Sequence, residues 1–456
     1  MKQKLTDIAE WLEAEGQNMK GIVVKGASID SRTVKNGDLF IPFRGEQVNG
    51  HKYVERAIES GATASLWMKD EPNPPQHLPL IFVENPEIAL QEMARVYRDM
   101  LDCTVIGITG SNGKTSTKDL VASALSPYFN VRKTEGNFNN ELGLPLTILS
   151  LDKETEFAVL EMGMSSFGEI SFLSKLAKPH YAVITNIGEA HMQDLGSREG
   201  IAKAKLEIIE GLDVGGKLFY DGDEDLLKGL INRLPDVDSI PFGTGEENEL
   251  RLGTLDSVED GSRFSITGLI EAEFTIPVYG SHQVKNALVA ILLANEAGVS
   301  TENIRSALKI ASLTEMRMQP VVAENGALFI NDAYNAAPTS MRAALAFINE
   351  TELRKEKWVV LGDMLELGEN EQAYHEMLAD QLMTMSLAGI LLYGKRMKWL
   401  YDELQKRGSA VRLVWTEDDY RLITDVINDC TDGNSVILLK GSRGMALEKI
   451  LKNGNA

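Results

Sequence analysis

Cysteine is almost absent from this chain, with only Cys103 and Cys430 among 456 residues. Two cysteines cannot form the disulfide framework of a small secreted domain, so that class of protein is excluded. No apolar run approaches the ~18 residues of a membrane span. The first residues, MKQKLTDIAEWLEAEG, carry acidic side chains where a secretory signal needs an apolar core. We therefore expect a cytoplasmic protein with no membrane span.

Positive charge is also scarce. Lys and Arg total 46 against 67 Asp and Glu, which gives a formal net charge of −21. Nucleic acid and anionic membranes bind to cationic surfaces, so neither is expected as a partner. The composition, 43% apolar and 25% charged, is that of a globular protein. At roughly 150 residues per domain, the length predicts about three domains.

The pattern of apolar segments divides the chain into three blocks. Residues 1–98 mix short strands with turns, include a proline-rich loop at 71–79, and lead through a helix over roughly 87–100 into the next block. Residues 99–313 alternate buried strands with helices, as in a mainly parallel sheet, and add antiparallel strands near their end. Residues 314–456 alternate again, as in a Rossmann-like domain. The sequence therefore predicts an α/β protein of three domains.

A glycine-rich loop lies between the apolar strand CTVIGI and a predicted helix, in the order that a P-loop requires. Its residues are Gly107, Ile108, Thr109, Gly110, Ser111, Asn112, Gly113, Lys114, Thr115 and Ser116. Backbone N–H groups and the helix N-terminus can surround a polyphosphate, Lys114 would reach its β and γ phosphates, and Thr115 would bind Mg²⁺. Ile108 stands where the general pattern has its first glycine. A glycine-rich turn is the alternative, but the flanking strand and helix favour a nucleoside triphosphate site.

Two more residues follow predicted strand ends. Glu161 ends the strand FAVLEMG, where a carboxylate can hold the Mg²⁺ that bridges the phosphates; a solvent-facing Glu is the alternative. His191 follows the strand YAVITN, and its spacing suits a surface histidine and a metal-facing one equally. On these features alone, an ATPase motor, a GTPase switch, a kinase and a ligase all stay open.

Four motifs together indicate a family. In order, GITGSNGKTS, EGNFNNELGLPLTIL, LEMGMSSFGEI and TNIGEAHMQDLGSREGIAKAKLEI resemble the ATP-dependent Mur ligases of peptidoglycan synthesis. The resemblance covers nearly the whole chain. Folylpolyglutamate synthases share the general plan but are not expected to carry a block like residues 1–98. The resemblance implies an ATP-dependent amide ligase that works through an acyl phosphate.

Motifs in the third block suggest the substrates. NDAYNAAPTSM, VVLGDMLELGENE and LLKGSRGM resemble the branch that joins UDP-N-acetylmuramoyl-tripeptide to D-alanyl-D-alanine. The Asp-Asn-Pro signature of the sister that adds the third residue is not found. Ala337 stands where the family usually has Asn, in Tyr-Asn-Ala-Asn-Pro. The alternatives are a sister ligase that adds a single amino acid, and a P-loop ATPase switch.

The resemblance also implies a role for each block. Residues 1–98 would bind the uridine nucleotide and 99–313 ATP, while 314–456 would close on ATP and bind the dipeptide. The protein is expected to be a monomer. The residues implied for the uridine nucleotide are Ser31, Arg32, Gly45, Asn49 and His51. Asn49 stands where Asp is common, and tight turns use such residues in any case.

Two Mg²⁺ ions are implied, the first bound by Thr115 and Glu161 and the second with help from His191. Lys205 matches the lysine that the family carbamylates with CO₂, which turns a cation into an anionic ligand. Lys203 lies close by, but the spacing from His191 and the leucine that follows favour Lys205. Lys114, Lys205 and His191 are the implied catalytic residues, and His191 is the single candidate for a general base.

The rest of the implied ATP site is spread along the chain. Asn139 and Asn140 lie in the family's asparagine-rich loop near the triphosphate. The segment GSHQVKN resembles the adenine motif through His282 and Asn286, with Gln283 in place of an Asn. Arg317 would move onto the phosphates, and Asp332 would meet the ribose.

Overall fold

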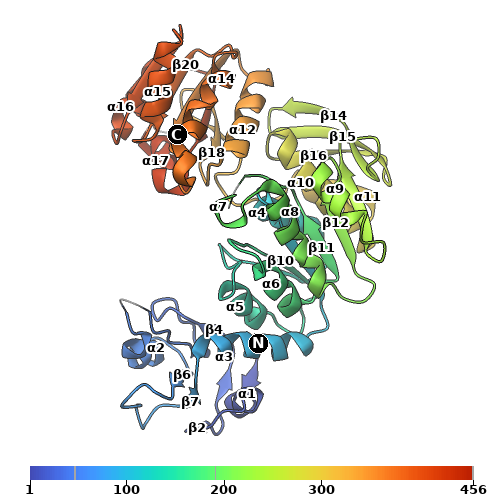
Figure 1. Ribbon diagram of the computed structural model, residues 1–456, viewed down its shortest axis with the longest axis vertical. Helices are drawn as coiled ribbons and strands as arrows, with labels where there is room; N and C mark the ends of the chain where they lie inside the picture. The colour runs from blue at the N-terminus through green and yellow to red at the C-terminus, as the bar shows by residue number, and fades with distance from the viewer. Residues whose placement is uncertain (46–47, 190–191, 454–456) are drawn as a thin grey trace. The chain divides into compact units, whose positions relative to one another are not determined.

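The computed structural model describes residues 1–45, 48–189 and 192–453. The chain forms two compact units, shown as ribbons in Figure 1. The first contains Met1–Thr109, Tyr128–Ile184 and Ala204–Leu218, and the second contains Gly110–Pro127, Thr185–Lys203 and Phe219–Ala456. The α/β class is confirmed in both, whereas the block boundaries near residues 98 and 313 stay predictions. No helix of the described residues is long and apolar enough to cross a membrane.

The first unit begins with a small sheet. Its order is β2-β7-β6-β5-β4, formed by Gly16–Gln17, Leu80–Val83, Ala64–Met68, Asp38–Phe40 and Gly26–Ser28. Only the β2–β7 pair is antiparallel. The helix α1 (Leu5–Trp11) buries Leu5, Ile8 and Ala9, and the proline-rich stretch 71–79 is a loop, as predicted.

The helix α3 (Pro86–Asp99) lies within one residue of its predicted bounds. Asn85 caps it, because its Oδ1 accepts from the Glu87 N–H at 2.8 Å, and proline occupies the first turn. At its other end the Tyr97 hydroxyl donates to the Leu151 carbonyl at 2.9 Å, and Arg98 Nε donates to the Ala177 carbonyl at 2.7 Å. These buried bonds attach α3 to the C-terminal ends of the helices α5 (Gly143–Ser150) and α6 (Glu169–Ala177) of the same unit.

The next sheet has nine strands, and the four at one end of it, in the order β11-β8-β10-β9, are all parallel. These four strands are Tyr181–Ile184, Thr104–Thr109, Phe157–Glu161 and Val131–Lys133, with helices α5 and α6 in the same unit. The four apolar runs CTVIGI, FAVLEM, YAVITN and KLFY, predicted as strands buried on both faces, form β8, β10, β11 and β12 (Lys217–Asp221). Because β8, β9, β10 and β11 are parallel, they all end at one edge, where ligands of such sheets bind.

The second unit contains the glycine-rich loop and its helix α4 (Lys114–Leu125), which packs against α10 (Ser281–Glu296). The strands β14 (Leu250–Val258), β15 (Gly261–Gly268) and β16 (Ala272–Ile276) form an antiparallel meander. This meander confirms the antiparallel addition expected near the end of the second block.

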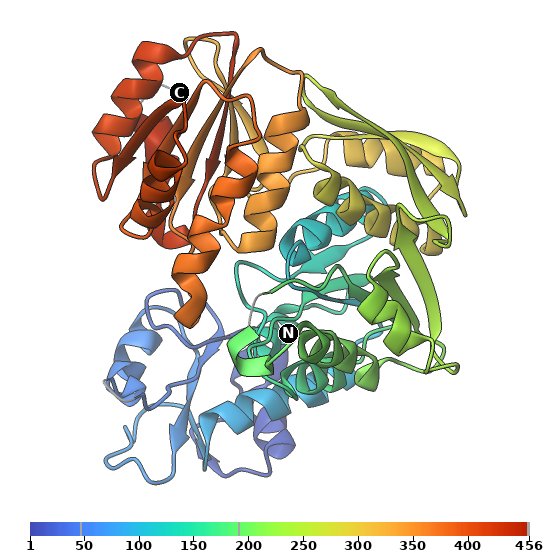
Figure 2. The same ribbon diagram turned by 45° about the horizontal axis from the view of Figure 1, so that its top comes forward.

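The C-terminal part of this unit is a six-stranded sheet of order β17-β18-β22-β19-β20-β21. Its strands are Gln319–Val322, Leu328–Asp332, Ser435–Lys440, Glu356–Gly362, Gly389–Tyr393 and Arg412–Thr416, and only β17 is antiparallel. Figures 1 and 2 show its helices on both faces.

One face of this sheet packs on α12 (Pro338–Glu350), α14 (Leu378–Leu382) and α15 (Met397–Lys406), and the other on α16 (Tyr420–Cys430) and α17 (Glu448–Asn453). Alternate residues of each strand enter the two cores, which is the doubly wound arrangement that was predicted. The segment EQAYHEMLADQLM, predicted as helical, forms two short helices, α13 (Glu371–Glu376) and α14.

A buried histidine makes the stability of this part depend on pH. His375 is fully buried, its Nε2 accepts from the Met364 N–H at 3.0 Å, and Asp363, Glu371 and Arg396 lie around the ring. Burial lowers the pKa of His375. As the pH falls below about 6.5, the unfolded chain takes up this proton before the folded one, so stability is complete above that pH and decreases below it.

We therefore expect His375→Gln to flatten the fall of the unfolding midpoint between about pH 7.5 and 5.5. Thermal unfolding followed by circular dichroism measures this slope. His77→Gln, at an exposed histidine, is the matched control and should keep the wild-type slope. An unchanged slope in a folded His375→Gln variant would contradict the prediction.

Candidate functional site

The glycine-rich loop has a backbone that only glycine can supply at two positions. Gly110 has φ +149° and Gly113 has φ +82°. A Cβ on Gly110 would lie 1.8 Å from Thr185 Oγ1, and one on Gly113 would lie 2.6 Å from Asn286 Oδ1. Both positions are therefore restricted by conformation and by space, which a surface turn would not require.

The loop is held by two residues that follow β11. Asn186 accepts the Ser111 N–H on its carbonyl at 3.1 Å and the Asn112 N–H on its Oδ1 at 3.0 Å. The Thr185 hydroxyl and the Asn186 amide both donate to the Asn112 carbonyl, at 2.6 and 2.9 Å. Sequence reasoning quoted Thr185 and Asn186 within the motif TNIGEAH but assigned them no role. Their contacts fix the curvature of the loop.

The start of α4 presents the groups expected of a phosphate site. Its N-cap is Gly113, which has no side chain to cap the helix, so the first-turn N–H groups face the loop. Lys114 Nζ donates to the Gly110 carbonyl at 2.8 Å, which places the ammonium over the loop. This cradle, with its fixed glycines, its helix N-terminus and its lysine, fits a polyphosphate.

Arg317 reaches the same helix turn. Its Nη2 donates to Thr115 Oγ1 at 3.1 Å, and its guanidinium lies 4.1 Å from the centre of the Tyr334 ring. The structure thus brings two predicted residues, Thr115 and Arg317, together, and it adds Tyr334. The linker before Arg317 is also tied to α4, because the buried Asp119 carboxylate accepts from Thr314 Oγ1 at 2.7 Å and from its N–H at 2.8 Å.

The predicted adenine and ribose residues lie in this unit too. Asn286 Nδ2 donates to Gln283 Oε1 at 3.2 Å, and the Asn286 amide faces Gly113. Burial lowers the pKa of His282, and Asp332 and Lys440 are the charged groups that act on its ring. Asp332 forms a buried ion pair with Lys440, a residue that sequence reasoning left without a role.

In the first unit, Glu161 meets the asparagine-rich loop. Glu161 is only 3% exposed, and its Oε1 accepts a hydrogen bond from Asn139 Nδ2 at 2.9 Å. Asn140 instead serves the backbone, because its Oδ1 accepts from the Gly143 N–H at 2.9 Å at the start of α5. Glu161 is therefore not a solvent-facing strand end, and its carboxylate is oriented by a predicted neighbour.

The two candidate lysines differ sharply in burial. Lys205, near the end of α8 (Arg198–Leu206), is 2% exposed, whereas Lys203 is exposed. An ordinary helical lysine is solvent-facing, so the burial supports the choice of Lys205. His191 lies outside the described residues. Among the residues that are described, no three His, Cys, Asp or Glu side chains gather as a metal cluster.

The predicted uridine-nucleotide residues follow β4 and β5, which are parallel and therefore end at one edge of the small sheet. Arg32 is exposed and paired with Asp30, which lowers the pKa of that carboxyl to about 2. Asn49 Oδ1 accepts from the His51 N–H at 3.1 Å, and His51 Nε2 accepts from the Met68 N–H at 3.1 Å.

The other two residues of this set are also part of the local backbone. Ser31 is buried, and the Gly45 N–H donates to the Val48 carbonyl at 2.9 Å. Asn49 and His51 likewise stabilise their own turn. Arg32 is the residue of the set with the most exposed charge.

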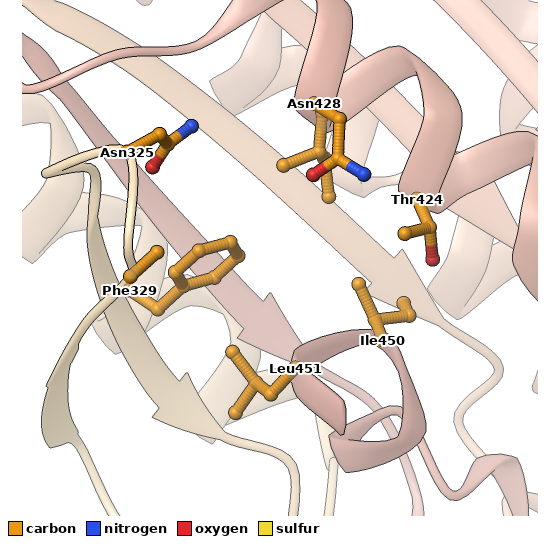
Figure 3. A pocket seen from close by; sticks show the side chains of 8 residues that line it. Asn325, Phe329, Thr424, Asn428, Ile450 and Leu451 are labelled. Carbon is orange, nitrogen blue, oxygen red and sulfur yellow. The ribbon is translucent and has the colours of Figure 1, made fainter. Parts of the chain in front are cut away.

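A small cavity in the C-terminal part has no comparable chemistry (Figure 3). It is lined by Ala323, Asn325, Phe329, Thr424, Ile427, Asn428, Ile450 and Leu451. The Asn325 amide is already used, since Nδ2 donates to the Thr431 carbonyl and Oδ1 accepts from the Ala327 N–H, both at 3.0 Å. The lining is otherwise mostly apolar, so this cavity is a packing feature beside α16 and α17.

Comparison with known proteins covers the whole chain. Residues 23–98 match the family described as Mur ligase family, catalytic domain, 108–294 the Mur ligase middle domain, and 316–443 the Mur ligase glutamate ligase domain. The chain is 42% identical to the UDP-N-acetylmuramoyl-tripeptide–D-alanyl-D-alanine ligase of Bacillus subtilis (strain 168), over 99% of this chain and 98% of that protein.

Solved structures agree. A crystal structure of MurF from Acinetobacter baumannii superposes with a TM-score of 0.88 at 28% identity, covering 100% of this chain and 99% of that one. MurF from Thermotoga maritima, solved in complex with ADP, gives 0.84 at 26% identity, covering 96% and 98%. The motifs, the three matched regions and the full-length relative agree, and the chain belongs to the Mur ligase family.

Proposed function

We propose that this chain is an ATP-dependent ligase that joins D-alanyl-D-alanine to UDP-N-acetylmuramoyl-tripeptide in peptidoglycan precursor synthesis. The observation that carries the proposal is the phosphate cradle of Gly110, Gly113 and Lys114, in a chain similar from end to end to a ligase of that name. The same cradle in an ATPase switch would not need the similarity to continue through residues 316–443.

The triphosphate is assigned to Gly110, Ser111, Asn112, Gly113, Lys114, Thr115, Ser116, Asn139 and Asn140. Arg317, which already contacts Thr115, would contact the phosphates. His282 and Asn286 would contact the adenine and Asp332 the ribose. These assignments keep the nucleotide beside the N-terminus of α4, where the helix dipole favours negative charge.

Mg²⁺ would be held by Thr115, Glu161, His191 and a carbamylated Lys205. When bound, Mg²⁺ neutralises the negative charge that spreads over the oxygens of the transferred phosphoryl group. Asn139 would orient the Glu161 carboxylate through the bond it already makes. The burial of Lys205 supports the carbamate, because a lysine that ligates a metal lies inside the site, whereas an ordinary helical lysine faces solvent.

The reaction follows from these groups. The carboxylate of the tripeptide is a poor electrophile, so it must be activated before an amine can attack it. A carboxylate oxygen attacks the γ phosphorus of ATP, which forms an acyl phosphate and releases ADP. Lys114 stabilises the charge that develops on the phosphoryl oxygens. The neutral amine of D-alanyl-D-alanine then attacks the acyl carbon, and inorganic phosphate leaves as the amide forms.

An α-amine has a pKa of ~8, so a substantial minority of it is already deprotonated at neutral pH, and a general base contributes little. We assign the uridine nucleotide to Ser31, Arg32, Gly45, Asn49 and His51, with Arg32 as the phosphate-facing cation. Residues 1–98, 99–313 and 314–456 would hold the uridine nucleotide, ATP and the dipeptide respectively. We place the reaction in the cytoplasm, with the protein as a monomer.

The direct test measures ADP release with each substrate omitted in turn. We expect ADP only when ATP, the UDP-linked tripeptide and D-alanyl-D-alanine are all present, with one amide formed per ADP. Mass spectrometry of the products from lysine-containing and diaminopimelate-containing tripeptides identifies the preferred third residue.

Two other results would overturn the proposal. Product formation with a free amino acid in place of the dipeptide would indicate a sister ligase. ADP release without a new amide bond would indicate an ATPase switch.

A further inference from the structure

Lys440 and Asp332 form an ion pair at the ligand-binding edge of the C-terminal sheet. They are register partners at the ends of the adjacent parallel strands β22 and β18. Lys440 Nζ donates to Asp332 Oδ2 at 2.5 Å. The two side chains therefore meet at the carboxyl ends of the strands, where ligands of such sheets bind.

The two partners are buried to different degrees. The Lys440 side chain is 3% exposed and that of Asp332 is 13% exposed. The ammonium thus lies behind the carboxylate, which keeps the accessible position. Asp332 Oδ1 is also fixed, because it accepts from the Met318 N–H at 3.1 Å. Each carboxylate oxygen has a second lone pair for a further donor, such as a ribose hydroxyl.

The Lys440 ammonium also hydrogen-bonds to the segment that follows β18. Lys440 Nζ donates to the Asn335 carbonyl at 3.2 Å, in the segment that carries Tyr334. The Tyr334 ring stacks on the Arg317 guanidinium, which in turn reaches Thr115. A single buried cation therefore fixes the carboxylate assigned to the ribose and the backbone beside the residue that supports Arg317.

Charge gives the pair a second effect. A buried carboxylate without a partner is costly, and beside a triphosphate it would also repel the ligand. Lys440 neutralises Asp332 without occupying its accessible side. A lysine with a purely structural role would need only to neutralise Asp332, and it could do so from any side of the carboxylate.

We propose that Lys440 is a positioning residue for nucleotide binding: it orients and neutralises Asp332 so that the carboxylate accepts the ribose hydroxyls of ATP. The inference rests on the proposed function, in which Asp332 meets the ribose. It adds a residue that acts through Asp332 rather than on the nucleotide itself.

The experiment compares Lys440→Met, Asp332→Asn and the double variant with the wild type. Kinetics with ATP, 2′-deoxy-ATP and 3′-deoxy-ATP give KM and kcat for each, and calorimetric titration with ADP measures binding without turnover. Lys398→Met removes a partly exposed lysine of the same part of the chain, which is paired with Asp402, and it is the matched control. Circular dichroism confirms folding of each variant.

We expect Lys440→Met to raise the KM for ATP by about tenfold or more, with a smaller change in kcat, because a charge-assisted contact is lost. Preference for ATP over the deoxy analogues should fall in Lys440→Met, in Asp332→Asn and in the double variant. The double variant should recover part of the loss in ATP affinity, because no unpaired carboxylate remains to repel the triphosphate. Lys398→Met should behave as the wild type.

Two results separate the inference from the proposed function. If Asp332→Asn alters the preference but a folded Lys440→Met does not, Lys440 is merely structural and the inference fails alone. If Asp332→Asn itself leaves the preference unchanged, the ribose assignment fails. Should Lys440→Met not fold, Lys440→Gln keeps an N–H donor without the charge, and wild-type preference in that variant would overturn the inference.

Discussion

Lys114→Ala is expected to reduce turnover by about a thousandfold or more while binding of the UDP-linked tripeptide stays near normal. The Lys114 ammonium lies over the loop, 2.8 Å from the Gly110 carbonyl, and is the cation that would contact the phosphates at the start of α4. Uridine-nucleotide binding is assigned to residues 1–98, which this change does not touch. Steady-state ADP release and calorimetric titration with the UDP-substrate measure the two quantities.

Lys153→Ala, at an exposed lysine in the loop before β10, is the matched control and should retain wild-type turnover. Joint loss of turnover and uridine-nucleotide binding in Lys114→Ala would indicate global unfolding or a wrong domain assignment. Retained turnover would contradict the phosphate site itself.

Lys205→Ala is expected to lose about a hundredfold or more in turnover and to regain part of it when short carboxylic acids are added. The physical reason is that the proposed carbamate would supply a carboxylate to the metal, and a small acid can occupy the space that the truncated side chain leaves. Turnover measured against increasing formate, acetate or propionate gives the size of the rescue.

Lys203→Ala provides the internal control, because Lys203 lies two residues away and is exposed. It should need no rescue. A folded Lys205→Ala variant that stays inactive at every acid concentration would count against the carbamate, and so would rescue of equal size in Lys203→Ala.

Much of the fold could be predicted because buried parallel strands have a simple signature. The runs CTVIGI, FAVLEM and SVILLKG are apolar on both faces, and each became a strand with a neighbouring strand on both sides. The division of EQAYHEMLADQLM into α13 and α14 was not predicted. The helical period continues across Met377, so the pattern of apolar residues carries no sign of the break.

The site was predicted where chemistry lies in one short motif. The loop around Gly110 and Gly113 adopts positive φ angles at its glycines, and its place between a strand and a helix was predicted from the sequence. Lys440 was different. Its partner Asp332 is more than a hundred residues earlier in the chain, and only the pairing of β18 with β22 brings the two together. Single-sequence reasoning sees residue types and spacing, but not which strands become neighbours.

The residues assigned to the uridine nucleotide show that a residue can be named from the sequence while its role stays open. Asn49 and His51 were named from a resemblance, and the structure shows both engaged in their own turn. A residue that stabilises a turn and a residue that binds a ligand have the same letter in the sequence. Their contacts distinguish them only when a substitution is measured for stability and for binding separately.

The position of β22 has a consequence for how the protein is made. It is the last of the six strands of its sheet along the chain. In the sheet, however, it lies between β18 and β19, which are both made long before it. During synthesis the sheet therefore stays split until β22 has left the ribosome and inserted. Asp332 acquires its counter-ion in that same step, so an unfinished chain that already contains the glycine-rich loop lacks the ion pair that holds the carboxylate we assign to the ribose. On that assignment, the chain can bind ATP fully only once its last strand is in place.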